Sequence, residues 1–258
     1  LSIGMQSAVP GELKALGRSH TVTDSEAAFN DARRAGFDNI SIDLMYGIPE
    51  QTVDSFMQSL SFAASRAPEH ISLYALKIED GTPFARRRES LPLPDEDAEY
   101  EMYMRAIDYL GTRGYKRYEI SNFAKPGYEC RHNIGYWKRV DYLGVGLGAS
   151  SLIDNVRYSN TRDLYTYLSV PADSLHETAA QITRNEQMEE FMFLGLRMRD
   201  GFYRDEFTQA FGIPIEAVYG DALNHLQQEE LLLKREGRIY LTDKGMDLNN
   251  YVVAQFML

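Results

Sequence analysis

The sequence has a single cysteine, Cys130, so it cannot form an internal disulfide. Cytosolic proteins keep their thiols reduced, and this cysteine usage predicts a cytoplasmic location. No apolar run reaches the roughly 18 residues that a membrane helix needs, and no basic leader precedes an apolar segment. We therefore expect no membrane insertion. The sequence also shows no internal repeat.

Basic residues are scarce relative to acidic ones. The chain has 27 Lys and Arg against 38 Asp and Glu, which gives a formal net charge of -11 and a pI near 5.0. Nonspecific binding to nucleic acid or to anionic lipid needs a basic surface, so this balance argues against both. With 258 residues and 44% hydrophobic residues, the chain can supply one large core or a medium and a small one. Its start at Leu1, inside a strand-like segment, predicts a fragment of a longer protein.

The stretch from Asn39 to Thr52 predicts a buried parallel strand, a turn and the start of a helix. Asp43 lies in the middle of that strand, where an unpaired carboxylate would cost several kcal/mol, so it needs a partner. Thr52 opens an amphipathic helix whose apolar residues share one face (Phe56, Leu60 and Ala63). A polar group near the carboxyl end of a parallel strand is where α/β domains place their chemistry.

Similar strands and helices alternate through the first half of the chain, which predicts parallel β-α-β units. We expect strands at 1–6, 70–78 and 118–123, and helices at 10–17, after a capping box from Thr23 to Glu26, and from Asp95 to Gly114. Residues 79–97 predict a long loop.

The alternation fails after residue 124, where aromatic residues and glycines crowd together up to residue 160. A linker is expected at 171–180. The remaining pattern of helices and a two-strand ribbon is typical of a winged-helix module (helices at 186–198, 203–211 and 215–229, a ribbon at 231–241 and a last helix from 242). The predicted domains are 1–126, 127–180 and 181–258.

Three polar residues are expected to meet at one rim of the first sheet: Gln6, Arg18 and Asp43. A guanidinium binds a carboxylate through two hydrogen bonds, and a carboxylate accepts from ribose hydroxyls or an ammonium group, so the set suits a zwitterionic nucleoside. The alternative is structural: an ion pair between Arg18 and Asp43, with Gln6 capping a backbone group.

Several motifs occur in a fixed order: Leu1-Ser-Ile-Gly-Met-Gln-Ser7, Leu16-Gly-Arg-Ser-His20, Ile42-Asp-Leu-Met-Tyr-Gly-Ile-Pro-Glu-Gln-Thr52, Ile71-Ser-Leu-Tyr-Ala-Leu76, Glu79-Asp-Gly-Thr-Pro-Phe84, Tyr118-Glu-Ile-Ser-Asn-Phe-Ala124 and His132-Asn-Ile-Gly-Tyr-Trp137. The set resembles the radical S-adenosylmethionine (SAM) proteins similar to oxygen-independent coproporphyrinogen III oxidase. The His-Asn-x-x-Tyr-Trp motif is similar to the haem chaperone branch of that family.

The resemblance implies an α/β fold, the second half of a partial (β/α)6 radical SAM barrel followed by a winged-helix-like α+β domain. It implies SAM contacts for Gln6, Arg18, Asp43 and Lys77, and haem contacts for His132, Tyr136 and Trp137, with His132 as the haem iron ligand. The same histidine has a structural alternative, a hydrogen-bonded residue among aromatic rings. The family's 4Fe-4S cluster needs three thiolates, which one cysteine cannot supply, so this chain by itself holds no cluster. Its catalytic residues are not identified.

The predicted function is that of a haem chaperone, which binds haem or a related tetrapyrrole and delivers haem to a target protein. One alternative is an oxygen-independent coproporphyrinogen III dehydrogenase, which performs radical oxidative decarboxylation. An alternative of another class is nucleic-acid binding by the winged helix, which the acidic excess between Glu186 and Leu258 argues against. Gly144-x-Gly-x-Gly148 lacks the spacing of a dinucleotide site and predicts a close backbone approach instead.

Overall fold

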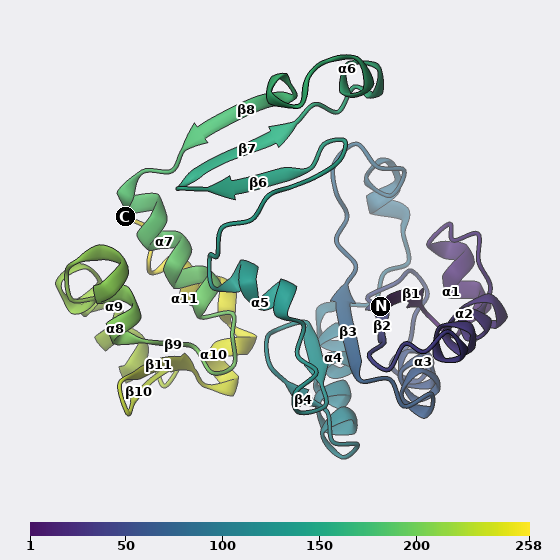
Figure 1. The fold of residues 1–258 in the computed structure, drawn as a ribbon. Coiled ribbons are helices and arrows are strands. Elements are labelled where there is room, and N and C mark those ends of the chain that lie inside the picture. Colours follow the sequence, from purple (N-terminus) through teal and green to yellow (C-terminus); the bar gives the residue numbers. More distant parts are fainter. The chain divides into compact units, whose positions relative to one another are not determined.

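Alternating apolar strands and amphipathic helices in the first half of the chain build one sheet covered by helices. The computed structural model describes residues 1–258, which separate into two compact units, unit 1 at 1–130 and unit 2 at 131–258 (Figure 1). The three-part domain division, with boundaries at residues 126 and 180, stays a prediction.

Unit 1 contains a five-stranded sheet with the strand order β1-β2-β3-β5-β4. Its elements are β1 (Ser2–Gln6), α1 (Pro10–Ala15), α2 (Val22–Arg34), β2 (Ser41–Tyr46), α3 (Val53–Ser65), β3 (His70–Ala75), the 3-10 helix η1 (Ala85–Ser90), α4 (Glu96–Gly111), β4 (Lys116–Arg117) and β5 (Asn122–Ala124). Strands β1, β2 and β3 are parallel, as the β-α-β pattern predicts. The loop expected from residue 79 is present, with η1 inside it.

The prediction of a further parallel strand at 118–123 is wrong. Strands β4 and β5 form a short hairpin, and β5 runs antiparallel to β3. The chain reverses at residues 118–121, where the amide of Tyr118 donates to the carbonyl of Asn122. A strand that follows a tight reversal cannot keep the direction that a helical crossover would give it.

One face of this sheet carries the core of unit 1. Apolar side chains from β2 and β3 meet apolar residues of the helices α2, α3 and α4 (Ile42, Leu44, Ile71 and Leu73 against Phe29, Phe56, Leu60, Met102 and Leu110). In α3 the buried positions recur at helical spacing, so the predicted apolar face is confirmed. Because strand side chains alternate between faces, the opposite face of the sheet is left to the residues in between.

Helix caps fix where two of these helices begin. Thr52 caps α3 in a reciprocal capping box with Ser55, which confirms the predicted start. Helix α2 begins two residues earlier than expected, because Thr21 and Asp24 form its capping box. The box predicted from Thr23 to Glu26 is therefore wrong. Both pairs have the required spacing, and Thr21, whose own backbone is extended as an N-cap requires, makes the cap.

Unit 2 begins with a helix and a three-stranded antiparallel sheet, followed by the winged-helix elements. These are α5 (Arg131–Trp137), β6 (Ser150–Ile153), β7 (Val156–Asn160), α6 (Leu164–Ser169), η2 (Ala172–Ser174), β8 (His176–Gln181), α7 (Arg184–Gly195), β9 (Phe202–Tyr203), α8 (Arg204–Phe211), α9 (Glu216–Gln228), β10 (Leu232–Arg235), β11 (Arg238–Leu241), α10 (Asp243–Asp247) and α11 (Asn249–Ala254).

The linker expected at 171–180 is wrong, since most of it forms η2 and β8. Strand β8 pairs with β7, and β6 and β7 form a hairpin across Asp154 and Asn155. Both turn residues have positive φ, as a type I′ hairpin turn requires. The predicted close backbone approach is confirmed at Gly144, where a Cβ would lie 2.2 Å from the carbonyl oxygen of Ser150.

The predicted winged helix is present and has one strand more than expected. Strands β10 and β11 form the ribbon, and β9 adds a third strand on the other side of β11. Gly201 makes this possible, because a Cβ there would lie 1.9 Å from the carbonyl oxygen of Ile239. A two-residue strand carries too little pattern to be recognised in a sequence.

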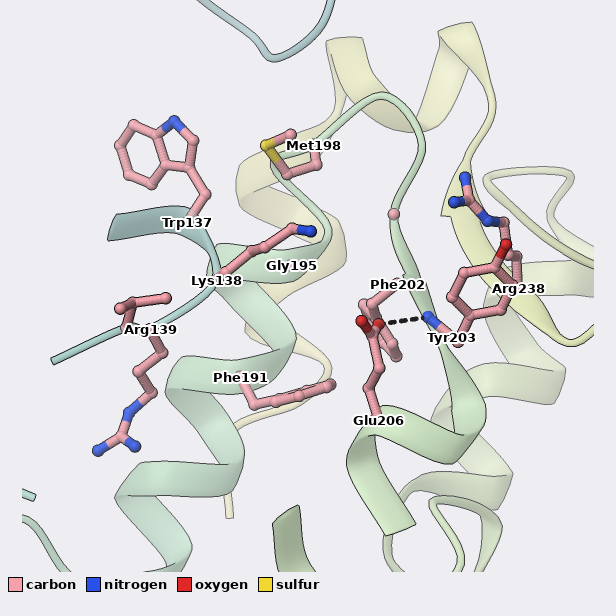
Figure 2. A pocket seen from close by; sticks show the side chains of 12 residues that line it. Trp137, Lys138, Arg139, Phe191, Gly195, Met198, Phe202, Tyr203, Glu206 and Arg238 are labelled. Atoms are coloured by element: carbon pink, nitrogen blue, oxygen red, sulfur yellow. Dashed lines mark hydrogen bonds between the residues drawn. The ribbon is translucent and has the colours of Figure 1, made fainter. Parts of the chain in front are cut away.

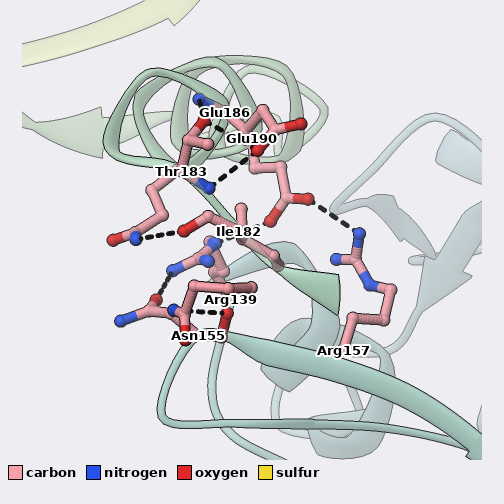
Figure 3. Close-up of polar contacts among 9 residues, drawn as sticks. Arg139, Asn155, Arg157, Ile182, Thr183, Glu186 and Glu190 are labelled. Atoms are coloured by element: carbon pink, nitrogen blue, oxygen red, sulfur yellow. Dashed lines mark hydrogen bonds and ion pairs between the residues drawn. The ribbon is translucent and has the colours of Figure 1, made fainter. Parts of the chain in front are cut away.

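A buried carboxylate ties α7 to the hairpin of β6 and β7 (Figure 3). Glu190, only 7% exposed, accepts from Arg139 at 2.7 Å and from Arg157 at 2.9 Å. Arg139 also donates to the side chain of Asn155 at 2.8 Å. Two cations and one buried anion leave the carboxylate fully paired, as its low exposure demands.

Candidate functional site

The sheet face opposite the core of unit 1 is polar and largely buried. Direct strand partners share a face, so the register aligns Gly4, Asp43, Ser72 and Asn122 across four strands, with His70 opposite Ser41 in the neighbouring row. His70, Ser72 and Asn122 are each less than 5% exposed. Buried polar groups in a row indicate a site built for polar contacts, because unpaired they would destabilise the fold.

Asp43 obtains its partners from hydroxyl groups. One carboxylate oxygen accepts from Ser2 Oγ at 2.7 Å, and the other accepts from Ser41 Oγ at 3.1 Å. No ion pair joins Asp43 to Arg18, so the structural alternative for this pair is not what the fold contains. Each oxygen of a carboxylate has two lone pairs, and one hydroxyl per oxygen leaves acceptor capacity for a ligand.

A chain of hydrogen bonds leads from Asp43 through a buried histidine. Ser41 Oγ contacts His70 Nδ1 at 2.8 Å, His70 Nε2 contacts the Tyr118 hydroxyl at 2.9 Å, and the amide of Cys130 donates to that hydroxyl at 3.3 Å. Burial lowers the pKa of His70 to about 4, so the ring is neutral at neutral pH.

With a neutral His70 ring, only one placement of the protons gives each hydrogen bond in this series one donor and one acceptor. Tyr118 donates to Nε2, His70 donates from Nδ1 to Ser41, and Ser41 donates to Asp43. We call these residues, Asp43, Ser41, His70 and Tyr118, the relay. Ser41 of the relay and Ser2 each donate to a different oxygen of Asp43, and together they fix the orientation of its carboxylate.

Gln6 lies at the end of β1 in a strained conformation. Its φ is 65°, and the amide of Ser7 donates to the carbonyl of Met5 at 2.8 Å, which closes a γ-turn around Gln6. The Gln6 side chain folds back over Gly4, since a Cβ there would lie 2.6 Å from Gln6 Nε2. Gly4 is the strand partner of Asp43, so the structure brings Gln6 and Asp43 to one region. Such strain is typical of binding sites.

A buried carboxylate supports this turn. Glu12, 5% exposed, accepts from Ser7 Oγ at 2.6 Å, Ser55 Oγ at 2.6 Å and Gln51 Nε2 at 3.0 Å. Three donors satisfy the charge of this carboxylate inside the fold. Ser7 directly follows Gln6, so the network fixes the backbone that presents the Gln6 amide.

Arg18 and Lys77 are both exposed. The guanidinium of Arg18 has no hydrogen-bond or ion-pair partner, and its loop is fixed near β1 by a hydrogen bond from the His20 ring to the Met5 carbonyl at 3.3 Å. Lys77 lies past the end of β3 and pairs with Glu79 at 3.0 Å. Of the four residues predicted to contact SAM, Gln6 and Asp43 lie on the polar face. Arg18 lies on the adjoining loop, and Lys77 lies beyond the end of β3. Their roles stay predictions.

Sequence reasoning missed His70, Ser41 and Tyr118 as parts of one site. His70 stands alone in the sequence, and only the strand register brings it beside Ser41 and the hydroxyl of Tyr118. One signal was available, the polar residues inside the strand motif Tyr118-Glu-Ile-Ser-Asn-Phe123. Glu119 in that motif is fully buried and accepts from the amide of Ser121 at 2.9 Å.

The residues predicted to contact haem fall into two groups in unit 2. His132 is exposed on α5 and meets Tyr136 edge to face, with ring centroids 4.6 Å apart, and Tyr136 meets Tyr142 at 4.7 Å. Trp137 lies about 140° around the helix from His132, where the guanidinium of Arg197 lies 4.4 Å from its ring centroid. The structure therefore joins His132 with Tyr136 and separates Trp137 from them.

No group of three or more His, Cys, Asp and Glu residues lies together in the structure in a way that could hold a metal ion. Cys130 is a partly exposed free thiol. None of the helices has the length and apolar character needed to cross a bilayer.

Comparison with known proteins places the chain in a family. Residues 182–248 match the family model of the HemN C-terminal domain. The whole chain aligns with proteins named Heme chaperone HemW from Lactococcus lactis subsp. lactis (strain IL1403) and Bacillus subtilis (strain 168), with 36% identity to each, and covers 69% of each relative.

A solved structure of coproporphyrinogen III oxidase (HemN) from Escherichia coli, described as a radical SAM enzyme, superposes on all of the chain with a TM-score of 0.82. The sequence identity is 22%, and the chain covers 63% of that oxidase, so this likeness concerns the fold. It confirms the predicted radical SAM fold in partial form. Because relatives named Heme chaperone HemW are 36% identical along the whole chain, the chain belongs to the Heme chaperone HemW family.

Proposed function

We propose that this chain acts within a haem chaperone of the radical SAM type, which binds haem and delivers it to a target protein. The observation that supports this most is the similarity along the whole chain to relatives named Heme chaperone HemW, of which it covers 69%. The cytoplasmic location and the target protein stay predictions, and the coproporphyrinogen III dehydrogenase alternative has no separate support from the site.

In this proposal His132 binds the haem iron, and Tyr136 contacts the porphyrin. The imidazole is exposed, so it can reach an iron atom without rearrangement of the core. Imidazole is a common axial haem ligand, and a tyrosine ring complements a flat apolar macrocycle. Trp137 does not share their side of α5, so we assign it no contact with the same haem.

Titration of the protein with haem, followed by the Soret band, tests this assignment. We expect His132→Ala to shift the Soret band and to lower the amount of haem bound at saturation. His225→Ala is the matched control, because His225 is also a partly exposed helical histidine of unit 2. The assignment is wrong if both variants bind haem as the unchanged protein does.

We further propose that the polar sheet face of unit 1 holds SAM. Asp43 would accept hydrogen bonds from hydroxyl or ammonium groups of the ligand, Gln6 would contribute its amide, and Arg18 would pair with the ligand carboxylate. Lys77 would contribute its backbone at the end of β3. SAM supplies a reactive sulfonium when bound, and the residues of this chain bind and orient it.

Isothermal titration of SAM tests this site. Asp43→Asn keeps the shape of the side chain but removes the charge, and hydrogen bonds to a charged group contribute about 1.5 to 3 kcal/mol, so we expect affinity to fall at least tenfold. Asp38→Asn, at an exposed position ahead of β2, should leave the affinity unchanged. Equal affinity for both variants would remove Asp43 from the site.

The 4Fe-4S cluster of radical SAM proteins does not fit the residues present. Three thiolates are needed, and Cys130 is the one cysteine among the 258 residues. No step of the proposal therefore involves a cluster bound by this chain.

A further inference from the structure

Unit 2 contains a cavity of about 350 Å³ that neither the haem group of residues nor the SAM site uses (Figure 2). The segment that follows α5 forms one side, β9 and the start of α8 form the other, and α7 lies beneath. Phe191 and Phe202 line it and meet edge to face, with centroids 4.9 Å apart. Gly195 permits this contact, because a Cβ there would lie 2.7 Å from the Phe202 ring.

The rim of this cavity is basic, although the chain as a whole is acidic. Lys138 points across the cavity in Figure 2, and its ammonium group has no hydrogen-bond or ion-pair partner. Arg238 lies on the opposite side, with its guanidinium 4.4 Å from the ring centroid of Tyr203, and it is already paired with Asp200 at 3.7 Å, so Lys138 is the cation left for a ligand. The acidic side chain of the lining, Glu206, is already used, since it accepts from the amide of Tyr203 at 2.7 Å.

Trp137 borders the cavity at the end of α5, but in Figure 2 its indole ring points away from Phe191 and Phe202. Lys138, the next residue, extends across the cavity instead, so it is the side chain that favours negative charge there.

The size of the cavity limits what can enter. An engineered protein cavity of about 150 Å³ binds one benzene molecule. The volume of about 350 Å³ is therefore enough for two rings with a substituent and too small for four pyrrole rings. A tetrapyrrole cannot be fully enclosed here, so the volume favours a smaller ligand.

We propose that this cavity is a binding site for a small aromatic anion, a one- or two-ring carboxylate or sulfonate. The rings would lie against Phe191 and Phe202, and the anionic group would pair with Lys138. Apolar walls with a few convergent charges are the usual composition of small-molecule sites.

The single tryptophan of the chain makes this site directly measurable, because all tryptophan emission comes from Trp137. The probes are 8-anilinonaphthalene-1-sulfonate and its neutral analogue N-phenyl-1-naphthylamine, added to the full chain while energy transfer from Trp137 is recorded. We expect saturable transfer with one sulfonate bound, and at least tenfold weaker binding of the neutral analogue, because it lacks the charge that Lys138 pairs with.

Lys138→Ala should weaken sulfonate binding about tenfold and leave binding of the neutral analogue unchanged. Lys244→Ala is the control, since that ammonium lies outside the cavity and donates to the carbonyl of Glu229. His132→Ala should not alter the titration. Equal sulfonate affinity in Lys138→Ala and Lys244→Ala, binding without energy transfer from Trp137, or loss of binding in His132→Ala would each overturn the proposal.

Discussion

Acidification should destabilise unit 1 through His70. The imidazole is 4% exposed, and burial holds its pKa at about 4, whereas an unfolded histidine has a pKa of about 6.5. As pH falls, the unfolded chain therefore binds a proton before the folded chain does. The stabilisation that comes from keeping His70 neutral is complete above pH 6.5 and is lost between pH 6.5 and 4.

The magnitude follows from the difference in pKa. About 2.5 units at 1.36 kcal/mol per unit give roughly 3 kcal/mol over the whole range, of which about 2 kcal/mol is lost between pH 7 and pH 5. His70→Gln has no imidazole to titrate, so its stability should lack this part of the pH dependence.

Hydrogen exchange measured by mass spectrometry in peptides that cover β2 and β3 gives the free energy of opening of unit 1 without a contribution from unit 2. We expect the opening free energy of the unchanged protein to fall by about 2 kcal/mol more than that of His70→Gln between pH 7 and pH 5, after correction for intrinsic exchange. His225→Gln, altered at an exposed histidine of unit 2, should follow the unchanged protein. Parallel curves for all three proteins would refute the placement of a neutral, buried His70.

Two further changes test other parts of the structure. Tyr118→Phe removes the hydroxyl shared by His70 and the amide of Cys130, so the opening free energy of unit 1 should fall by about 2 kcal/mol. Tyr109→Phe is the control, because the Tyr109 hydroxyl makes no hydrogen bond, and it should change the opening free energy by less than about 0.5 kcal/mol. An equal effect of the two variants would contradict the relay. Glu190→Gln leaves Arg139 a buried cation without its anion, so urea unfolding of unit 2, followed by Trp137 fluorescence, should show a loss of about 3 kcal/mol. Glu177→Gln, at an exposed position of β8, should unfold as the unchanged protein does, and a Glu190→Gln curve that overlaid it would show that the buried pairing contributes nothing.

Local signals fixed much of the fold. The start of α3 at Thr52 follows from a side chain that caps its own backbone three residues on, and the buried face of α3 follows from the spacing of its apolar residues. The alternation of β1 and β2 predicts only that Gly4 and Asp43 share a face. The γ-turn at Gln6, which folds its amide back over Gly4, interrupts the strand register and was not predictable.

The sequence by itself determined those features because each depends on residues within a turn or two of one another, or on the fixed period of a strand. Only the tertiary structure decided that β5 runs antiparallel to β3, that His70 links Asp43 to Tyr118, and that Trp137 lies apart from His132. These features join residues far apart in sequence, or depend on which neighbour each face of a helix meets. The free energy that favours them comes from packing and buried hydrogen bonds, and both depend on residues that no short stretch of the sequence contains together.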